Sequence, residues 1–207
     1  MAQFILDLVQ KQFPQAVLEA TTRHGDEVLV VEAASWKAVA KFLRDDPRIS
    51  MEMLMDLTAV DYPYRDPRFE IVAHFYSLSK GHRLRFKTRV GDPEGEVVRV
   101  DSLSDLWASA NWAERECFDM FGVEFVGHPD LRRILMYPEF EGFALRKDYP
   151  AERIQPLIPY LEIPNIEKIA PFGLDEGMPF GRQTHATGIR GRSIGEAANW
   201  ADRGADD

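Results

Sequence analysis

Polar and apolar residues alternate most regularly along residues 82–90. The alternation separates an apolar set (Leu84, Phe86, Thr88, Val90) from a cationic set (Arg83, Arg85, Lys87, Arg89). A period of two predicts a strand with one face buried and the other toward solvent. We expect this strand to form a hairpin with residues 69–78, joined at residues 79–81.

The cationic face of this strand has two interpretations. Its four positive charges could bind an acidic partner, or they could form a solvated face that pairs with neighbouring carboxylates. We favour the second interpretation, because a run of charge on one face of an element is most often simply solvated.

Upstream of the hairpin, the pattern predicts two helices and three strands. Helical spacing of apolar residues appears in residues 3–12 and from Trp36 to about Arg44, where Ser35 is a plausible N-cap. Extended segments are expected at residues 16–22, 27–33 and 51–60.

From Leu103 to Phe121 the apolar residues recur at helical spacing. The resulting stripe comprises Leu103, Leu106, Trp107, Ala110, Cys117, Phe118 and Phe121. It predicts a helix over 103–121 that ends at Gly122, a residue suited to a left-handed C-terminal cap. Because Cys117 lies within the stripe, we expect it to be a small core residue rather than a nucleophile.

Glu114 falls in the middle of this apolar stripe, close to Trp107 in helical projection. A buried carboxylate needs a partner or a proton, and Arg132 and Arg133 are the expected partners. The opposite face carries three large or charged residues, which suggests that this side is covered as well. They are Trp112, Glu116 and Asp119.

An acid–base site is one interpretation of this region, with Glu114 as base, His128 as acid and Arg132 as an anion clamp. The other is an ion-pair cluster that fixes the turn after the helix. No nucleophile, phosphate-binding loop or metal-ligand set accompanies these groups in the sequence. We therefore favour the structural cluster and predict no catalytic, cofactor-binding or metal-binding residues on this chain.

Charge and cysteine content narrow the function classes. A net charge of −9 argues against binding nucleic acid, or anionic lipid by charge alone. The single cysteine, Cys117, cannot form an internal disulfide or supply the four thiolates that an iron–sulfur cluster usually needs. The sequence contains no apolar run long enough to span a membrane and no recognisable secretory signal.

The composition changes after Pro150. Residues 151–207 hold 7 of the 14 glycines and 5 of the 13 prolines, with scattered apolar residues. We expect residues 1–150 to form one α+β domain, with an N-terminal portion (1–50) and a core (51–150) that contains the helix and its turn. Residues 151–207 are expected to be an extended, irregular tail that wraps a partner subunit.

The run from Glu114 to Leu135 resembles the signature of the C subunit of the bacterial proton-pumping NADH:quinone oxidoreductase, respiratory complex I. A second block, residues 141–150, and a further segment, residues 56–63, are also similar to that family. Ala144 departs from the proline usual in the second block, and Cys117 replaces a larger residue. The matching residues that we take as structural or interface positions are Glu114, Arg115, Glu116, Asp119, Gly122, Gly127, His128, Pro129, Asp130, Leu131, Arg132, Arg133, Arg146, Lys147 and Asp148.

The resemblance implies an α+β fold with a largely antiparallel or mixed sheet flanked by helices, followed by the tail. It also implies a structural subunit of the hydrophilic arm, packed beside the D subunit and close to the B subunit. Flavin and iron–sulfur clusters would lie on other subunits. The chain would be peripheral, on the cytoplasmic side of the bacterial inner membrane, and would reach the membrane only through the complex.

Two other functions remain open at this point. The equivalent subunit of a membrane-bound nickel–iron hydrogenase or formate hydrogenlyase would have a similar sequence, because it meets a similar interface. An independent soluble enzyme that uses Glu114 and His128 is the more distant alternative.

Overall fold

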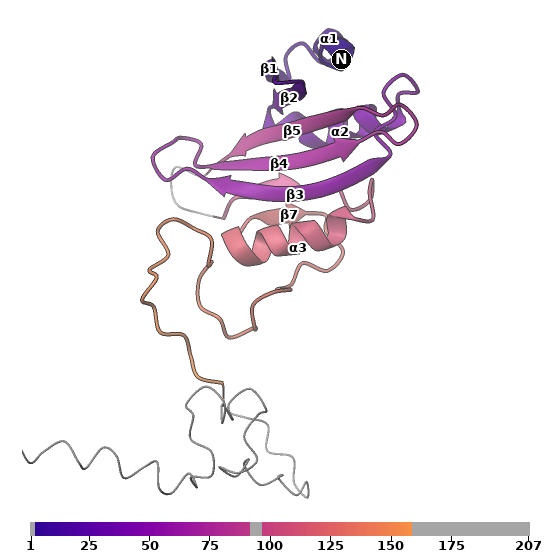
Figure 1. The fold of residues 1–207 in the computed structure, drawn as a ribbon. Helices are drawn as coiled ribbons and strands as arrows, with labels where there is room; N and C mark the ends of the chain where they lie inside the picture. Colours follow the sequence, from indigo (N-terminus) through magenta and orange to yellow (C-terminus); the bar gives the residue numbers. More distant parts are fainter. Residues whose placement is uncertain (1–2, 92–96, 159–207) are drawn as a thin grey trace, which may run out of the picture. The chain divides into compact units, whose positions relative to one another are not determined.

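The main sheet has five strands in the order β1-β2-β5-β4-β3 (Figure 1). The computed structural model describes residues 3–91 and 97–158. Neighbouring strands are antiparallel except β2 and β5, which are parallel, so the sheet is mixed. The strands are β1 (Val17–Arg23), β2 (Asp26–Val31), β3 (Met53–Asp61), β4 (Phe69–Tyr76) and β5 (Arg83–Val90).

Helices and a small second sheet complete the described part of the chain. Short strands β6 (Arg99–Asp101) and β7 (Glu124–Val126) pair in parallel on either side of α3 in the sequence. The helices are α1 (Gln3–Gln12), the 3-10 turn η1 (Ala33–Ser35), α2 (Trp36–Asp45) and α3 (Ala110–Phe121). This arrangement confirms the expected α+β class, with a mixed sheet flanked by helices.

The predicted hairpin is present as β4 and β5. The two strands pair in register from Phe69 opposite Val90 to Tyr76 opposite Arg83. The apolar residues of β5 point to the core and the cations point away from it, so the period-two pattern predicted the buried face correctly. β4 ends at Tyr76 and β5 begins at Arg83, so at the turn both strands are slightly shorter than the predicted segments 69–78 and 82–90.

One aromatic stack connects the helices to the buried face of the sheet. Trp36 of α2 stacks on Phe86 with ring centroids 4.3 Å apart and an interplanar angle of 12°. Phe75 lies between Phe86, at 5.7 Å, and Trp107, at 4.6 Å. The indole N–H of Trp107 donates to the carbonyl of Met51 at 3.1 Å, which satisfies its polar atom inside the core.

The third helix is shorter than predicted, beginning at Ala110 rather than Leu103. In one continuous helix, residues 103 and 114 would lie roughly 17 Å apart along the axis. Instead, the N–H of Leu103 donates to the Glu114 carboxylate at 2.6 Å, so the preceding segment folds back over the helix. Leu103 and Trp107 are still buried, and their spacing therefore mimicked a longer helix.

Both predicted caps occupy the expected positions. Ser35 is the N-cap residue of α2, although it also belongs to η1 and its side chain makes no capping hydrogen bond. Gly122 does end α3, with φ of 75° in the left-handed region, as the sequence indicated.

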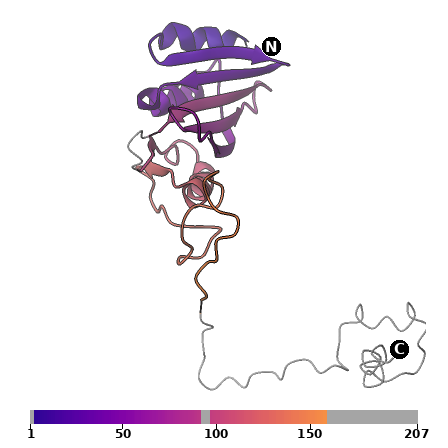
Figure 2. The same cartoon turned by 90° about the vertical axis from the view of Figure 1, so that its left-hand side faces the viewer.

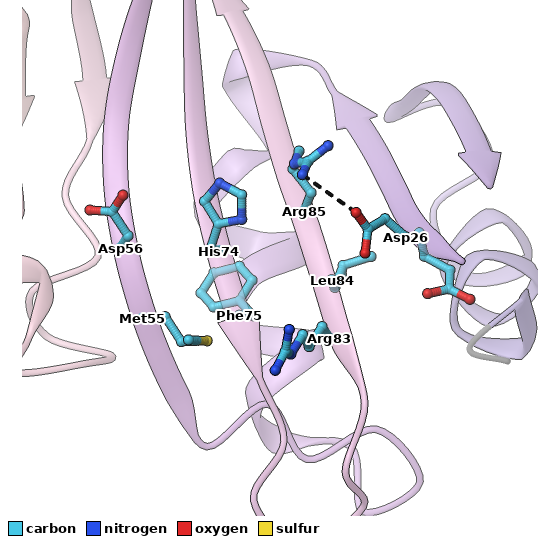
Figure 3. A pocket seen from close by; sticks show the side chains of 9 residues that line it. Asp26, Met55, Asp56, His74, Phe75, Arg83, Leu84 and Arg85 are labelled. Atoms are coloured by element: carbon cyan, nitrogen blue, oxygen red, sulfur yellow. Dashed lines mark ion pairs between the residues drawn. The ribbon is translucent and has the colours of Figure 1, made fainter. Parts of the chain in front are cut away.

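The cationic face of β5 lies on the side of the sheet opposite the core (Figure 3). Three of its cations pair with carboxylates: Arg85 with Asp26 at 3.7 Å, Lys87 with Glu70 at 2.6 Å and Arg89 with Glu19 at 2.7 Å. The fourth, Arg83, lies over the Tyr76 ring at 5.6 Å. This is the locally paired face that we favoured from the sequence.

A cavity of about 330 Å³ opens on this face, and His74 lies in it between Asp56 and Arg85 (Figure 3). Burial, followed by the nearby charge of Arg85, lowers the pKa of His74. Charges of both signs line the cavity, so it favours no one class of ligand.

Candidate functional site

Residues 127–158, here called the C-terminal segment, follow β7 and run along α3 on the side away from the main sheet (Figures 1 and 2). The segment contains turns and irregular backbone but no helix or strand within residues 127–158. Buried backbone groups that lack secondary structure must find other hydrogen-bond partners. The side chains that supply these partners are largely the residues of the sequence signature.

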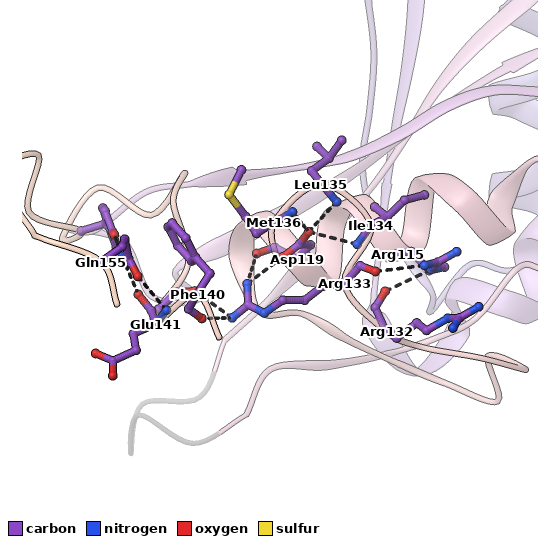
Figure 4. A network of polar contacts seen from close by, with 12 residues as sticks. Arg115, Asp119, Arg132, Arg133, Ile134, Leu135, Met136, Phe140, Glu141 and Gln155 are labelled. Carbon is purple, nitrogen blue, oxygen red and sulfur yellow. Dashed lines mark hydrogen bonds and ion pairs between the residues drawn. The ribbon is translucent and has the colours of Figure 1, made fainter. Parts of the chain in front are cut away.

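Asp119 is the hub of the first network (Figure 4). Its Oδ2 accepts the backbone N–H groups of Ile134, Leu135 and Met136 at 3.1, 2.8 and 2.8 Å. Its Oδ1 accepts an N–H of the Arg133 guanidinium at 2.7 Å. One fully buried carboxylate thus fixes three successive residues of the C-terminal segment to α3.

Electrostatics at Asp119 agree with this geometry. Burial by itself would raise the pKa of Asp119, but the N–H groups of residues 134–136 and the Arg133 side chain together hold it below its ordinary value. The prediction that this face of the helix is covered is correct at Asp119. It is wrong at Trp112, which is 71% exposed, and at Glu116, which is also exposed.

Two arginines of the signature donate to backbone carbonyls. Arg115 on α3 donates through Nε to the carbonyl of Arg132 and through Nη2 to that of Arg133, both at 3.0 Å. Arg133 donates through Nη2 to the carbonyls of Phe140 and Gly142 at 3.0 and 3.1 Å. Because one planar guanidinium offers several donors, each arginine can hold two stretches of chain together.

A second network joins the C-terminal segment to the main sheet. Arg68 binds the buried carboxylate of Asp61 through Nε and Nη2 at 2.7 and 2.8 Å, and it pairs with Asp148 at 3.0 Å. The backbone N–H of Lys147 donates to Asp61 at 2.7 Å. The hydrogen bonds from Arg68 are the main reason why the pKa of Asp61 lies below its ordinary value.

Gly122 is required for a third contact, at the end of α3. The Nε–H of Arg146 donates to the carbonyl of Phe121 at 2.5 Å, and its guanidinium lies 4.4 Å from the Phe143 ring centroid. A Cβ on residue 122 would approach Arg146 Nη2 and the Phe143 ring to 2.5 Å. Glycine therefore serves both the left-handed backbone and the close packing of Arg146.

Glu114 is fully buried, as predicted, but its partners are not Arg132 or Arg133. Its Oε2 accepts the Ser102 hydroxyl and its Oε1 accepts the backbone N–H of Leu103, both at 2.6 Å. Burial raises the pKa of Glu114 to about 7, although these two hydrogen bonds oppose the shift. The helix phase was correct, whereas the partner came from the segment before the helix.

The two arginines that were expected at Glu114 are used elsewhere. Arg133 pairs with Asp119, and Arg132 pairs with Asp130 at 2.9 Å with 72% of its side chain exposed. The sequence could not assign either pair, because both carboxylates and both arginines lie on the same signature run.

The acid–base interpretation finds no support in this geometry. The His128 ring bonds through Nε2 to the carbonyl of Asn111 at 3.0 Å and accepts the N–H of Asp130 through Nδ1 at 3.1 Å. Glu114 bonds instead to Ser102 and Leu103, and its carboxyl is closed off from solvent. Burial also raises the pKa of the Cys117 thiol, which suits a core residue rather than a nucleophile.

The remaining signature residues shape the turn after β7. Gly127 has φ of 86°, Pro129 and Asp130 are exposed, and Leu131 packs against the hydrophobic core. Ser102 and Arg68, which bind the buried carboxylates of Glu114 and Asp61, were not among the residues predicted from the sequence. Neither has a local pattern that could have revealed this role.

The structure offers no evident metal site or membrane span within residues 3–91 and 97–158. No group of three His, Cys, Asp or Glu residues there is arranged to hold a metal ion. Among the helices of that same part, none is long and apolar enough to cross a membrane.

Comparison with known proteins identifies a family. The family described as "Respiratory-chain NADH dehydrogenase, 30 Kd subunit" matches residues 29–155. The C 2 subunit of NADH-quinone oxidoreductase from Rhizobium etli is 39% identical over 171 residues, which cover 83% of each chain. The C subunit of the Rhodopseudomonas palustris NADH-quinone oxidoreductase is 44% identical over 144 residues, which cover 70% of each.

A solved structure shows the same fold at lower sequence similarity. It belongs to the membrane-bound sulfane sulfur reductase, an archaeal respiratory membrane complex. The match has a TM-score of 0.62 and 24% identity, and it covers 73% of this chain and 86% of the other.

The raised pKa of Glu114 predicts an unusual pH dependence of stability. Between pH 4.5, the ordinary value, and about 7, the folded state keeps a proton that the unfolded chain has released. The stability contributed by Glu114 should therefore fall as pH rises through this window, by at most about 3 kcal/mol. We expect Glu114→Gln to remove this slope.

Urea unfolding of both chains between pH 4.5 and 8 measures the effect as a difference, in which His74 and other titrating groups cancel. Glu116→Gln, a more exposed carboxylate on the same helix, is the matched control and should follow the unsubstituted chain. Equal slopes for the unsubstituted chain and Glu114→Gln would contradict this account.

Replacing the hub carboxylate should loosen the C-terminal segment. In Asp119→Asn the amide lacks the charge that Arg133 needs and places N–H donors among other donors. We expect a loss of about 3 kcal/mol, the low end for a broken buried pair, because Arg133 is 20% exposed. Above the ordinary carboxyl pKa of 3.8 this stabilisation is fully present, and it disappears as acid protonates Asp119.

Asp130→Asn is the control for this change, since Asp130 also pairs with an arginine but both partners are more than half exposed. Its effect on the free energy of unfolding should stay within about 0.5 kcal/mol. Similar losses in the two variants would show that the Asp119 network does not stabilise the fold.

Proposed function

Because the chain belongs to the family of the 30 kDa subunit of the respiratory-chain NADH dehydrogenase, we propose that it is a structural subunit of a proton-translocating NADH:quinone oxidoreductase. In this role it carries no redox centre and no active site of its own. One observation supports the structural role above others. Asp119 and Arg115, two charged residues of the signature, bind backbone groups of their own chain and fix residues 132–136 to α3.

The proposed position of the chain is in the hydrophilic arm, beside the D subunit and close to the B subunit. It would then support the part of the complex that reduces quinone, while flavin and iron–sulfur clusters lie on other subunits. By the same resemblance, the chain would be peripheral, on the cytoplasmic side of the bacterial inner membrane, and attached through the complex.

The C-terminal tail has a proposed role in this assembly. Its composition favours an irregular chain whose scattered apolar residues dock on a neighbouring subunit, most simply the D subunit. Residues 159–207 lie outside the described residues. The described start of the predicted tail, residues 151–158, contacts earlier residues of the C-terminal segment, since Arg153 pairs with Glu141 at 2.5 Å and Gln155 bonds Tyr149.

Co-purification tests membership and the role of the tail together. An affinity-tagged full chain, expressed in a bacterium that lacks its own C subunit, should co-purify with the D and B subunits and restore NADH:quinone activity. A chain that ends at Ile158 keeps the described contacts and should fold but assemble poorly. Recovery of the full chain without any other subunit would contradict the proposed function, and normal assembly of the shortened chain would contradict the role of the tail.

The absence of a redox centre is tested on the chain alone. Purified protein should show no visible absorption band and no stoichiometric iron, zinc or flavin, because the single cysteine is buried in the core. Metal analysis and a visible spectrum provide the measurement, and the assembled complex is the positive control. A stoichiometric cluster or flavin on the isolated chain would overturn this part of the proposal.

A further inference from the structure

A groove of about 480 Å³ lies between the outer side of α3 and the start of the C-terminal segment. Its volume is within the range of about 300–1,000 Å³ that is usual for sites that enclose a ligand. The lining combines half-buried apolar side chains with arginines from both sides. The lining residues are Arg115, Phe118, Leu131, Arg132, Arg133, Met136 and Pro138.

The apolar part of the groove is open to a partner. Phe118, Leu131 and Met136 are only half-buried, and Pro138 is at the surface. Trp112 lies one helical turn before Arg115 on the same outer face and is 71% exposed. Tryptophan and arginine on one exposed surface are the residue types most enriched at the centres of protein interfaces.

The cationic part is not neutralised equally. The charge of Arg133 is paired with buried Asp119, and that of Arg132 with exposed Asp130. Arg115 differs, because its hydrogen bonds go to two backbone carbonyls and, in the part of the chain that the structure describes, no carboxylate lies within salt-bridge distance of it. A guanidinium has five N–H donors, so three donors of a fixed cation remain for another molecule.

The groove is also held in shape before any partner arrives. Three backbone N–H bonds to Asp119 fix residues 134–136, and Arg115 fixes the carbonyls of residues 132 and 133 (Figure 4). A preformed site loses less conformational entropy on binding than a flexible one. The chain as a whole carries a net charge of −9, so a fixed, unpaired cation beside an apolar floor is a local exception.

We propose that this groove binds an extended segment of a neighbouring subunit, with an apolar side chain on the floor and an Asp or Glu on Arg115 and Arg132. The positive charges of Arg115 and Arg132 favour an acidic segment over a basic or neutral one. A soluble anion would bind these arginines but would leave the apolar side chains of the groove uncovered. This inference rests on the proposed function, because it assumes that the chain is assembled with other subunits.

Photo-crosslinking in the assembled complex tests the occupant directly. The photoreactive residue p-benzoylphenylalanine replaces Pro138, which lines the groove, and in a control it replaces Met55 on the opposite side of the sheet. We expect the first variant to cross-link to a segment of another subunit that contains Asp or Glu beside an apolar residue. Cross-links only to lipid, to a second copy, to residues 159–207 or to a segment without acidic residues would overturn the proposal, as would none.

Charge reversal supplies an independent readout. Arg132→Glu should lower the recovery of this chain in the complex at least about tenfold, because it places like charges together at the interface. Arg48→Glu is the matched control: Arg48 is 62% exposed and pairs with Asp46 two positions earlier, as Arg132 pairs with Asp130. Thermal unfolding of both variants alone checks that each still folds.

The outcomes separate the two proposals. If the unsubstituted chain fails to co-purify with other subunits, the proposed function is wrong and the groove proposal is wrong with it. If that chain assembles but Arg132→Glu and Arg48→Glu assemble equally well, only the groove proposal is wrong.

Discussion

The carboxylate of Asp119 is the point on which the C-terminal segment depends. That segment has no helix or strand within residues 127–158, so its backbone groups cannot satisfy one another in a regular ladder. Asp119 accepts three of the N–H groups, while Arg115 and Arg133 donate to four of the carbonyls. Charged side chains thus take the place that secondary structure has elsewhere in the fold, and charge-assisted hydrogen bonds are strong enough to do so.

The same arrangement recurs at two other buried carboxylates. Asp61 accepts the N–H of Lys147, 86 residues away, and Glu114 accepts that of Leu103. The difference between them is the cation. Asp61 has an arginine beside it and a lowered pKa, whereas Glu114 has a hydroxyl and an N–H, and burial raises its pKa to about 7. Burial without a cation therefore makes Glu114 the carboxyl of this site that titrates near neutral pH.

These contacts give several charged residues of the signature a structural role in holding the chain's own backbone. A cluster of carboxylates and arginines usually suggests acid–base chemistry. Here the carboxylates of Asp61, Glu114 and Asp119 are closed off from solvent and accept N–H groups of the chain's own backbone, so a substrate cannot reach them. Beside the network lie an exposed tryptophan, Trp112, and an apolar groove lined by Arg115, which has no carboxylate partner among the described residues. These are features of a surface that binds another protein.

Much of the fold could be read from local patterns along the chain. Alternation in residues 82–90 predicted the buried face of β5, the helical stripe placed Glu114 and Cys117 inside, and Gly122 marked the end of α3. The signature run was sufficient to indicate the family that the comparisons confirm. Each of these signals depends on neighbours a few residues apart, and such spacing is visible in the sequence.

The partners of the buried carboxylates could not be read in this way. Nothing in the sequence distinguishes Arg133 from Arg132, yet the first is paired with Asp119 inside the network and the second lies in solvent. Glu114 bonds to Ser102 rather than to an arginine, because the chain before α3 turns back and places the Ser102 hydroxyl 2.6 Å from the Glu114 carboxylate. A carboxylate accepts any donor that the fold brings near, so its partner depends on how distant segments pack and not on the residues beside it.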